Sequence, residues 1–421
     1  MRVLVIGSGA REHALCWRLR GCPSVEGVLA APGNPGMGPV ARRVPAGTLD
    51  APALLRLVRD EAVDLVVVGP EDPLVAGVAD RLRAGGAAVL GPSAAAAEIE
   101  GSKSWAMDLC HRHGIPAPAA VRCGTAAEAL ARARVCPLPA VLKADGLMSG
   151  KGVVVAETRA EAEAAAVALS AAGPVVFEEF LTGREVSAFA LCDGRHAAFY
   201  GVARDHKRLY PGNRGPMTGG MGAFAPVPDV DAATEARIRG ILQAAVTALG
   251  AEGRPFVGFL FAGLMLTADG PRVLEFNCRF GDPEAQSLLC LLEGDVAPQW
   301  LRAARGALEP GEGASFAAGA ALGVVLASPG YPEAARPGQT IAGLGPDGQI
   351  PGGAALAFHA ATALDGGTWR TAGGRVLTVV GRGADLAAAR AAAYAAARTV
   401  HFEGAQWRPD MGVAPGAQPA E

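Results

Sequence analysis

Four short apolar segments in the first hundred residues each end in a glycine-marked loop. They predict strands at Val3–Ile6, Val25–Ala30, Val63–Val68 and Ala87–Leu90, with helical segments between them. Strands that alternate with helices form a parallel sheet, and the carboxyl ends of parallel strands are where such sheets bind ligands. Ordinary turn chemistry accounts for each loop on its own, but it accounts less well for the fact that all four loops lie at the same edge of the sheet. The sequence therefore predicts an α/β domain with a ligand site along one sheet edge.

The first of these loops carries half of a dinucleotide-binding fingerprint. Gly7 and Gly9 fit the G-x-G-x-x-G pattern, but Glu12 stands at the third glycine position. A nicotinamide dinucleotide is therefore disfavoured. The free amide groups and the dipole at the start of the next helix, predicted at Glu12–Arg20, still favour a lone phosphate or phosphoribosyl group.

A second signal lies far downstream, in the segment Leu274–Glu284. Side chains alternate faces along a strand, so Glu275, Asn277 and Arg279 are predicted to share one face, while the apolar residues between them share the other. A carboxylate and an amide oxygen two residues apart suit Mg²⁺, and a guanidinium suits a substrate carboxylate. A solvated edge strand that ends at a Gly-Asp-Pro turn explains the same residues, so the rest of the chain must decide.

Lysine is rare in this chain. Of 38 basic residues only four are lysine, namely Lys103, Lys143, Lys151 and Lys207, and each lies in a short polar or glycine-marked segment. Lysine is a compact point charge on a flexible stem, whereas arginine is a planar fork. The four lysines either escaped a general drift toward arginine or hold several phosphate oxygens.

Two glycine-rich loops follow the same logic. The loop 144–152 lies between predicted strands at Pro139–Lys143 and Val153–Ala156, which favours a flap over phosphates and excludes a P-loop, because a strand follows where a helix should. Next to it, Val176 and Phe177 beside two glutamates suit a purine slot. The second loop, 211–222, is too rich in glycine for a core and is typical of a functional or mobile segment.

Composition narrows the class of protein. A length of 421 residues predicts two to four domains, and a half-hydrophobic chain of net charge −3 is neither disordered nor typical of nucleic-acid binding. Neither a signal peptide nor a membrane span is predicted. Eight cysteines without a CxxC pair predict neither disulfides nor metal clips. We expect a soluble, cytoplasmic protein with small-molecule partners and with neither nucleic acid nor membrane as a partner.

Ten patches occur in an order that closely resembles the glycinamide ribonucleotide synthetase family. They are GSGAREHAL at 7–15, PGNPG at 32–36, VGPEDPLVAG at 68–77, GPS at 91–93, EGSKSWAMD at 100–108, LKADGLMSGKGVVVA at 142–156, FEEFLTGRE at 177–185, DHKR at 205–208, TGGMGAFAP at 218–226 and EFNCRFGDPE at 275–284. The resemblance extends to Asp410 and implies an ATP-grasp fold, α/β with α+β parts. The implied units are an N-terminal domain (1–101), a central domain (102–116 and 186–317), a small mobile B domain (117–185), a C-terminal α+β domain (318–410) and a disordered tail (411–421).

The resemblance also implies an activity and its site. The activity is ATP-dependent ligation of glycine to 5-phosphoribosylamine through glycyl phosphate, with Mg²⁺ or Mn²⁺, by a monomer or weak homodimer. The implied nucleotide-binding residues are Lys103, Lys143, Gly150, Lys151, Gly152, Glu178, Glu179, Phe180, Leu181, Glu185 and Phe276, and the implied metal ligands are Glu275 and Asn277. Gly9, Arg11, Glu12, Asn34, Pro35, Gly36 and Glu71 would line the phosphoribosylamine site. Asp205, Arg279, Gly281 and Asp282 would surround the reacting glycine, and Lys207 is implied as a further catalytic residue.

The chain departs from the family pattern at two places and from other ATP-grasp enzymes at a third. Met217 stands where asparagine is expected, and Met148-Ser149 replaces a smaller pair in the flap. The predicted strand Phe259–Leu266 offers no carboxylate, so a second Mg²⁺ would rely on the nucleotide and Glu275. His13 and His206 are open to either substrate contacts or structural roles. Another ATP-grasp carboxylate–amine ligase or carboxylase, or a catalytically silent nucleotide-binding protein, remains an alternative.

Overall fold

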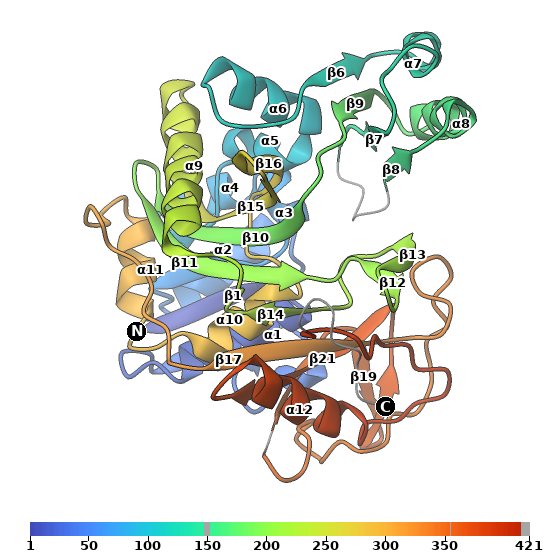
Figure 1. Cartoon of the computed structure of the whole chain (residues 1–421). Helices are drawn as coiled ribbons and strands as arrows, with labels where there is room; N and C mark the ends of the chain where they lie inside the picture. The colour runs from blue at the N-terminus through green and yellow to red at the C-terminus, as the bar shows by residue number, and fades with distance from the viewer. Residues whose placement is uncertain (147–151, 354, 414–421) are drawn as a thin grey trace.

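The computed structural model describes residues 1–146, 152–353 and 355–413 and is a mixed α/β structure (Figure 1). Its N-terminal part is the predicted parallel sheet, in the order β3-β2-β1-β4-β5. The strands are β1 (Arg2–Gly7), β2 (Gly27–Pro32), β3 (Arg42–Arg43), β4 (Leu65–Val68) and β5 (Val89–Leu90). The helices are α1 (Ala10–Arg20), the 3₁₀ turn η1 (Pro35–Met37), α2 (Ala51–Asp60), α3 (Glu71–Val75), α4 (Val78–Ala84) and α5 (Ala94–Gly101). The parallel α/β prediction is confirmed, and β3, which consists of two exposed arginines, was not predicted.

One antiparallel sheet runs through the central and C-terminal parts of the chain, in the order β16-β15-β10-β11-β14-β17-β21-β18. Its strands are β10 (Arg184–Asp193), β11 (Ala197–Asp205), β14 (Gly222–Ala225), β15 (Val257–Thr267), β16 (Gly270–Asn277), β17 (Ala320–Ala327), β18 (Ala355–His359) and β21 (Arg375–Gly383). The helices of this region are α6 (Lys103–Arg112), α9 (Ala232–Ala251), α10 (Glu284–Leu291), α11 (Ala297–Ala304) and α12 (Leu386–Ala397). Two hairpins, β12 (Arg208–Tyr210) with β13 (Arg214–Met217) and β19 (Thr362–Asp365) with β20 (Thr368–Thr371), complete it.

A third body, which we call the small unit, stands at the upper right of Figure 1. Its sheet, β6-β9-β7-β8, consists of β6 (Ala120–Cys123), β7 (Ala140–Ala144), β8 (Val153–Ala156) and β9 (Val175–Glu179), and its helices are α7 (Ala126–Ala133) and α8 (Arg159–Ser170). Leu142 and Phe177 lie opposite each other in the ladder, are 0% and 3% exposed, and belong to a core separate from the rest. Thr158 and Glu161 form the capping box that begins α8.

Two boundaries differ from the prediction. Strand β16 ends at Asn277, four residues before Gly281, because the amide of Cys278 leaves the ladder and donates to the carboxylate of Glu100. At the other end of the chain, Met411 is fully buried and its amide donates to the hydroxyl of Tyr394 at 3.1 Å. Ordered packing therefore extends past the predicted boundary at 410, and residues 414–421 lie outside the described residues.

All eight cysteines are free and buried. Within the described ranges, no helix combines the length and the apolar character needed to cross a membrane.

A buried polar contact joins the N-terminal sheet to the C-terminal part. The backbone amide of His359 donates to Nδ1 of His13 at 2.9 Å, and the amide group of Asn34 donates to the carbonyl of His359 at 2.7 Å. A Cβ at Gly36 would collide with the His359 ring, so only glycine lets these segments approach. Burial, with the neighbouring His359, lowers the pKa of His13 from 6.5 to about 3.

We expect this contact to make stability depend on pH. Since His13 stays neutral in the folded state down to about pH 3 while the unfolded chain binds its proton below 6.5, the stability that His13 contributes falls as pH drops through this window. Between pH 7.5 and 5.5 the loss is about 1.4 kcal/mol. The difference in Tm between these two pH values should therefore be smaller for His13→Gln than for the unmutated chain. His401→Gln, at an exposed histidine, is the control and should leave the difference unchanged; equal behaviour of both variants would contradict the prediction.

Candidate functional site

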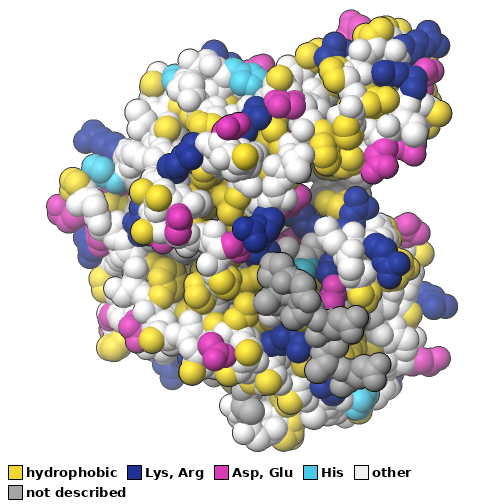
Figure 2. Space-filling model, in the orientation of Figure 1, with side chains coloured by type: hydrophobic (Ala, Val, Ile, Leu, Met, Phe, Trp, Pro, Cys, Tyr) yellow, Lys and Arg dark blue, Asp and Glu magenta, His cyan; other side chains and the backbone are white. Residues whose placement is uncertain are grey.

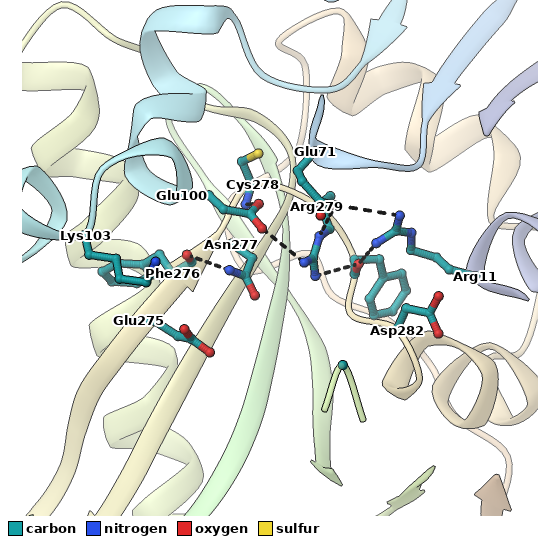
Figure 3. Close-up of polar contacts among 12 residues, drawn as sticks. Arg11, Glu71, Glu100, Lys103, Glu275, Phe276, Asn277, Cys278, Arg279 and Asp282 are labelled. Carbon is teal, nitrogen blue, oxygen red and sulfur yellow. Dashed lines mark hydrogen bonds and ion pairs between the residues drawn. The ribbon is translucent and has the colours of Figure 1, made fainter. Parts of the chain in front are cut away.

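The predicted row of polar side chains lies at the centre of the candidate site, with Glu275 and Asn277 on β16 and Arg279 two residues past the end of the strand. Figure 3 shows Glu275, Asn277 and Arg279 following one another, from Lys103 at one end to Arg11 at the other. The residues that alternate with them are buried, Phe276 and Phe280 at 2% exposure and Cys278 at 0%. Figure 2 shows the molecule hollowed between the small unit and the β12–β13 hairpin, with basic side chains along the rim.

Two lysines lie at the end of the site that was predicted to bind the nucleotide. Lys143, on β7, is 5% exposed; its ammonium lies 2.7 Å from a carboxylate oxygen of Glu178 and donates to the carbonyl of Leu274 at 2.8 Å. The ammonium of Lys103, at the start of α6, donates to the carbonyl of Gly146 at 2.6 Å. Burial, with the charge of Lys143 adding to it, lowers the pKa of Lys103. Two cations thus gather where the small unit meets β16.

Glu178 has an unused acceptor. Its Oε2 binds Lys143, but Oε1 is buried and has no hydrogen-bond partner among the described residues. Burial raises the pKa of Glu178, although the charge of Lys143 opposes this. A buried acceptor without a partner is costly, so this atom fits a donor on a ligand.

The other predicted nucleotide residues have varied surroundings. Glu179 is exposed and pairs with Arg272 at 2.8 Å, which ties the small unit to β16. Phe180 is 40% exposed, Leu181 is 6% exposed and Phe276 is 2% exposed. Phe177, expected in the purine slot, packs instead into the core of the small unit. Val176 and Glu178 lie on the same face of the sheet as Lys143, so Phe177 lies on the opposite face, against the helices. Gly152 is buried, whereas Gly150, Lys151 and Met148-Ser149 lie outside the described residues.

Glu275 is a carboxylate that stays charged. Its Oε1 lies 3.3 Å from the ammonium of Lys207, which also lies 3.5 Å from Glu185. Burial alone would raise the pKa of Glu275, but the charges of Lys207, Lys143 and Lys103 outweigh it and lower the pKa to about 2.

Asn277 presents an amide oxygen beside that carboxylate. Its NH₂ group donates to the carbonyl of Phe276 at 2.9 Å, which leaves its oxygen without a hydrogen bond among the described residues. Among the residues that the structure describes, no group of three or more His, Cys, Asp or Glu side chains could hold a metal ion by itself. Glu275 and Asn277 therefore fit a hard cation whose other ligands are phosphate oxygens and water.

Arg279 links the centre of the site to two carboxylates. Its Nε donates to Glu71 at 3.0 Å, and another guanidinium nitrogen lies 3.0 Å from Glu100 (Figure 3). Burial would raise the pKa of Glu71, but Arg279 and Arg11 lower it to about 2. Burial raises the pKa of Glu100, against the charge of Arg279. Glu71 was predicted and Glu100 was not; the only signal for Glu100 is an acidic residue in an alanine-rich apolar helix.

At the N-terminal end, Glu12 takes the place expected for a phosphate. Its carboxylate accepts from the amide of Gly9 and from Nε of Arg11, both at 2.6 Å. A Cβ on Gly7 or Gly69 would overlap the Glu12 side chain. The start of α1 is thus capped by a residue of the helix itself. The guanidinium of Arg11, which pairs with Glu12, also donates to the carbonyl of Phe280 at 3.1 Å.

The polar atoms of the Asn34 side chain are all taken up by hydrogen bonds within the protein. The Asn34 amide group donates to the carbonyls of Ser8 and His359, and its oxygen accepts from the amide of Gly36. The predicted segment Asn34–Gly36 thus supports the contact with the C-terminal part. His13, which accepts from His359, has a structural role there as well.

The residues predicted to bind glycine lie close to two charged residues that were not predicted, Arg375 and Glu284. Asp282 lies 3.3 Å from Arg375 of β21 and accepts from Gln286 at 2.8 Å. The carboxylate of Glu284 accepts from the hydroxyl of Ser187 at 2.6 Å and lies where a Cβ on Gly281 would be.

The carboxyl group of Asp205 is buried close to another acid. Burial, together with the nearby carboxylate of Glu284, holds the pKa of Asp205 well above its usual range, although Lys207 opposes this. In contrast, Arg375 and Arg11 outweigh burial and lower the pKa of Asp282. His206 packs against Phe224, and burial lowers its pKa to about 4. Met217, at the end of β13 opposite Arg208, supplies no polar group.

Three models of one protein family match almost the whole chain. The phosphoribosylglycinamide synthetase N domain matches residues 1–100, the ATP-grasp (A) domain matches 101–285 and the C domain matches 321–414. Phosphoribosylamine–glycine ligases from Caulobacter vibrioides and Rhizobium meliloti are 45% and 47% identical to this chain over 420 and 419 residues, and each match covers 98% of both proteins.

Solved structures agree with the fold. The phosphoribosylamine–glycine ligase of Thermotoga maritima matches with a TM-score of 0.84 and 33% identity, over 97% of this chain and all of that one. A biotin carboxylase from Campylobacter jejuni in complex with β,γ-ATP matches with a TM-score of 0.70 at 15% identity over 96% of this chain and 92% of that one, which shows a common fold alone. The expected ATP-grasp fold is confirmed. With its N, ATP-grasp and C domains in order along nearly its whole length, this chain belongs to the phosphoribosylglycinamide synthetase family.

Proposed function

We propose that this site ligates glycine to 5-phosphoribosylamine at the expense of ATP, through glycyl phosphate. Membership of the family supports the ligase activity. One observation carries the assignment to this site: Glu275 stays charged among three lysines, next to Asn277 and in line with Arg279. That arrangement combines a cation site, phosphate-binding charges and a carboxylate-binding guanidinium within a few residues of one strand.

The nucleotide would lie between the small unit and β16. Lys103 and Lys143 would hold its phosphate oxygens, and the unpaired Oε1 of Glu178 would accept from the adenine amino group. A Mg²⁺ or Mn²⁺ ion held by Glu275 and Asn277 would neutralise charge on the phosphates. Lys207, 3.3 Å from Glu275, would spread the charge that develops on the transferring phosphoryl group.

Glycine would lie at the junction of Asp205, Asp282 and Arg279. The two carboxylates would bind its ammonium group and the guanidinium would orient its carboxylate, whose oxygen attacks the γ-phosphorus as the bond to ADP breaks. The amine of phosphoribosylamine, near Arg11 and Glu71, then attacks the acyl carbon and expels phosphate. Water would destroy the acyl phosphate, so we expect the small unit to close over the site during turnover. We expect the enzyme to act in the cytoplasm as a monomer or weak homodimer.

The decisive experiment measures ADP release with ATP and Mg²⁺ while glycine and freshly generated phosphoribosylamine are varied separately and together. Release only when both are present would support the proposal. Release with a different carboxylate–amine pair would keep the phosphoryl-transfer chemistry and reject the substrates. ATP binding without release for any pair would indicate a silent nucleotide-binding protein instead.

Glu275→Gln should abolish most metal-dependent turnover. It removes a charged ligand from a site where the cation supplies several kcal/mol of stabilisation, so kcat should fall roughly 100-fold or more. ADP release against Mg²⁺ concentration is the measurement. Glu403→Gln, at an exposed glutamate, is the matched control. Turnover of Glu275→Gln close to that of the control would overturn the ligand assignment.

Lys143→Arg tests whether a point charge is required. The Lys143 ammonium is nearly buried and makes two short contacts, and a guanidinium is too large and too flat to repeat them. We expect the KM for ATP to rise roughly 10-fold or more in Lys143→Arg. We expect a similar rise in Lys143→Met, which removes the charge altogether. An arginine variant with unchanged KM, beside an impaired methionine variant, would show that charge alone suffices.

A further inference from the structure

The glycine-rich loop between β13 and β14 lies in contact with the candidate glycine site on one side and with the C-terminal part of the chain on the other. On the inner side, the amide and the hydroxyl of Thr218 both donate to the carbonyl of Lys207 at 2.8 Å, and the amide of Met221 donates to the carbonyl of His206 at 2.9 Å. A Cβ on Gly220 would lie 2.8 Å from Asp205 and would overlap Pro283. The loop thus fills the space between Asp205 and the Gly281–Pro283 turn.

On the outer side, two C-terminal side chains hold the same residue of this loop. The amide of Gly219 donates to the hydroxyl of Tyr331 at 3.0 Å, and its carbonyl accepts from a guanidinium nitrogen of Arg375 at 2.6 Å. Gly219 is therefore bonded in both directions by a part of the chain that is remote in sequence. Gly374 allows this, because a Cβ there would meet the Tyr331 ring at 2.6 Å.

Arg375 also reaches past the loop. The nitrogen that binds Gly219 donates to the backbone carbonyl of Asp282 at 2.8 Å, and a second nitrogen lies 3.3 Å from its carboxylate. The Arg375 side chain is 24% exposed, so this charged fork is mostly withdrawn from water. A single planar group thus joins the loop to the turn that carries Asp282, and the rigid fork of a guanidinium fixes the orientation of its partners as well as their distance.

We propose that Arg375, supported by Tyr331, is a positioning residue that sets the spacing between Asp205 and Asp282 and so determines the affinity for the amino-acid substrate. The proposal rests on the glycine site proposed above and extends it to the C-terminal part of the chain. Arg375 acts through Gly219 and Asp282 and does not itself touch glycine. It is placed by β21, which belongs to the same eight-stranded sheet as β11, the strand that ends at Asp205.

The test compares steady-state kinetics of Arg375→Met, Arg375→Lys and Tyr331→Phe with those of the unmutated chain. Misplacement of a binding group by about an ångström costs up to about 100-fold, so we expect Arg375→Met to raise the KM for glycine roughly 10- to 100-fold while the KM for ATP stays within about twofold. Arg375→Lys keeps the charge without the fork and should recover part of the loss. Tyr331→Phe removes one hydrogen bond and should raise the glycine KM by a smaller factor.

Arg382→Met is the matched control, since Arg382 lies on the same strand and donates to the carbonyl of Cys290. If the role of Arg375 is purely structural, Arg375→Met will lower Tm and the fraction of active enzyme but leave the KM for glycine unchanged, or it will raise the KM values for glycine, ATP and phosphoribosylamine together. Either result overturns the proposal. Should Arg375→Met fail to fold, the lysine and phenylalanine variants decide by the same KM comparison. An unmutated chain that releases no ADP with glycine and phosphoribosylamine would instead reject the proposed function, and this proposal with it.

Discussion

The pairing of Arg279 with Glu71 and Glu100 is the interaction on which the rest of the site depends. The three side chains come from the segment just after β16, from the start of α3 and from the end of α5, so the contact joins the parallel sheet to the antiparallel one. All three are largely withdrawn from water, and a buried charge that loses its partner is strongly destabilising. The same network therefore has two effects. It places a guanidinium at the centre of the site, and it holds the parallel and the antiparallel sheet in a fixed relative position.

Balanced charge explains why so many ionised groups tolerate burial here. Glu275 is opposed by three lysines, and Glu71 by Arg279 and Arg11. Asp205 and Glu284, in contrast, are two acids close together, and the raised pKa of Asp205 reflects that repulsion in addition to burial. A substrate ammonium placed there would relieve the repulsion, whereas phosphate oxygens are attracted to the lysine end. The charges of the protein's own side chains thus separate the places for a cationic and an anionic group.

Much of the fold could be predicted from the sequence, because its signals are local. Apolar runs ending in glycine predicted the parallel strands, and alternation predicted that Glu275 and Asn277 share one face of β16, whereas Arg279 lies past the end of that strand. The scarcity of lysine singled out Lys103, Lys143 and Lys207, which lie at the site.

The failures have one physical cause. Glu100, Glu284 and Arg375 matter through partners that are remote in sequence, and no periodicity reveals such pairs. Likewise, Phe177 faces the small unit's own core and Glu12 caps its own helix, because tertiary packing decides the direction of each side chain. The resemblance to a family supplied names for the roles of residues, but the partners of each residue became visible only in three dimensions.

The way the chain enters and leaves the small unit has a further consequence. Its first strand, β6, and its last, β9, are hydrogen-bonded neighbours, with Ala120 opposite Glu178. Between them lies a body with a core of its own. The small unit is thus an inserted domain whose two ends lie next to each other, and the rest of the chain is its host. In evolution such a module can be exchanged between related chains without breaking the host sheet, because the host needs only two ends held a strand's width apart.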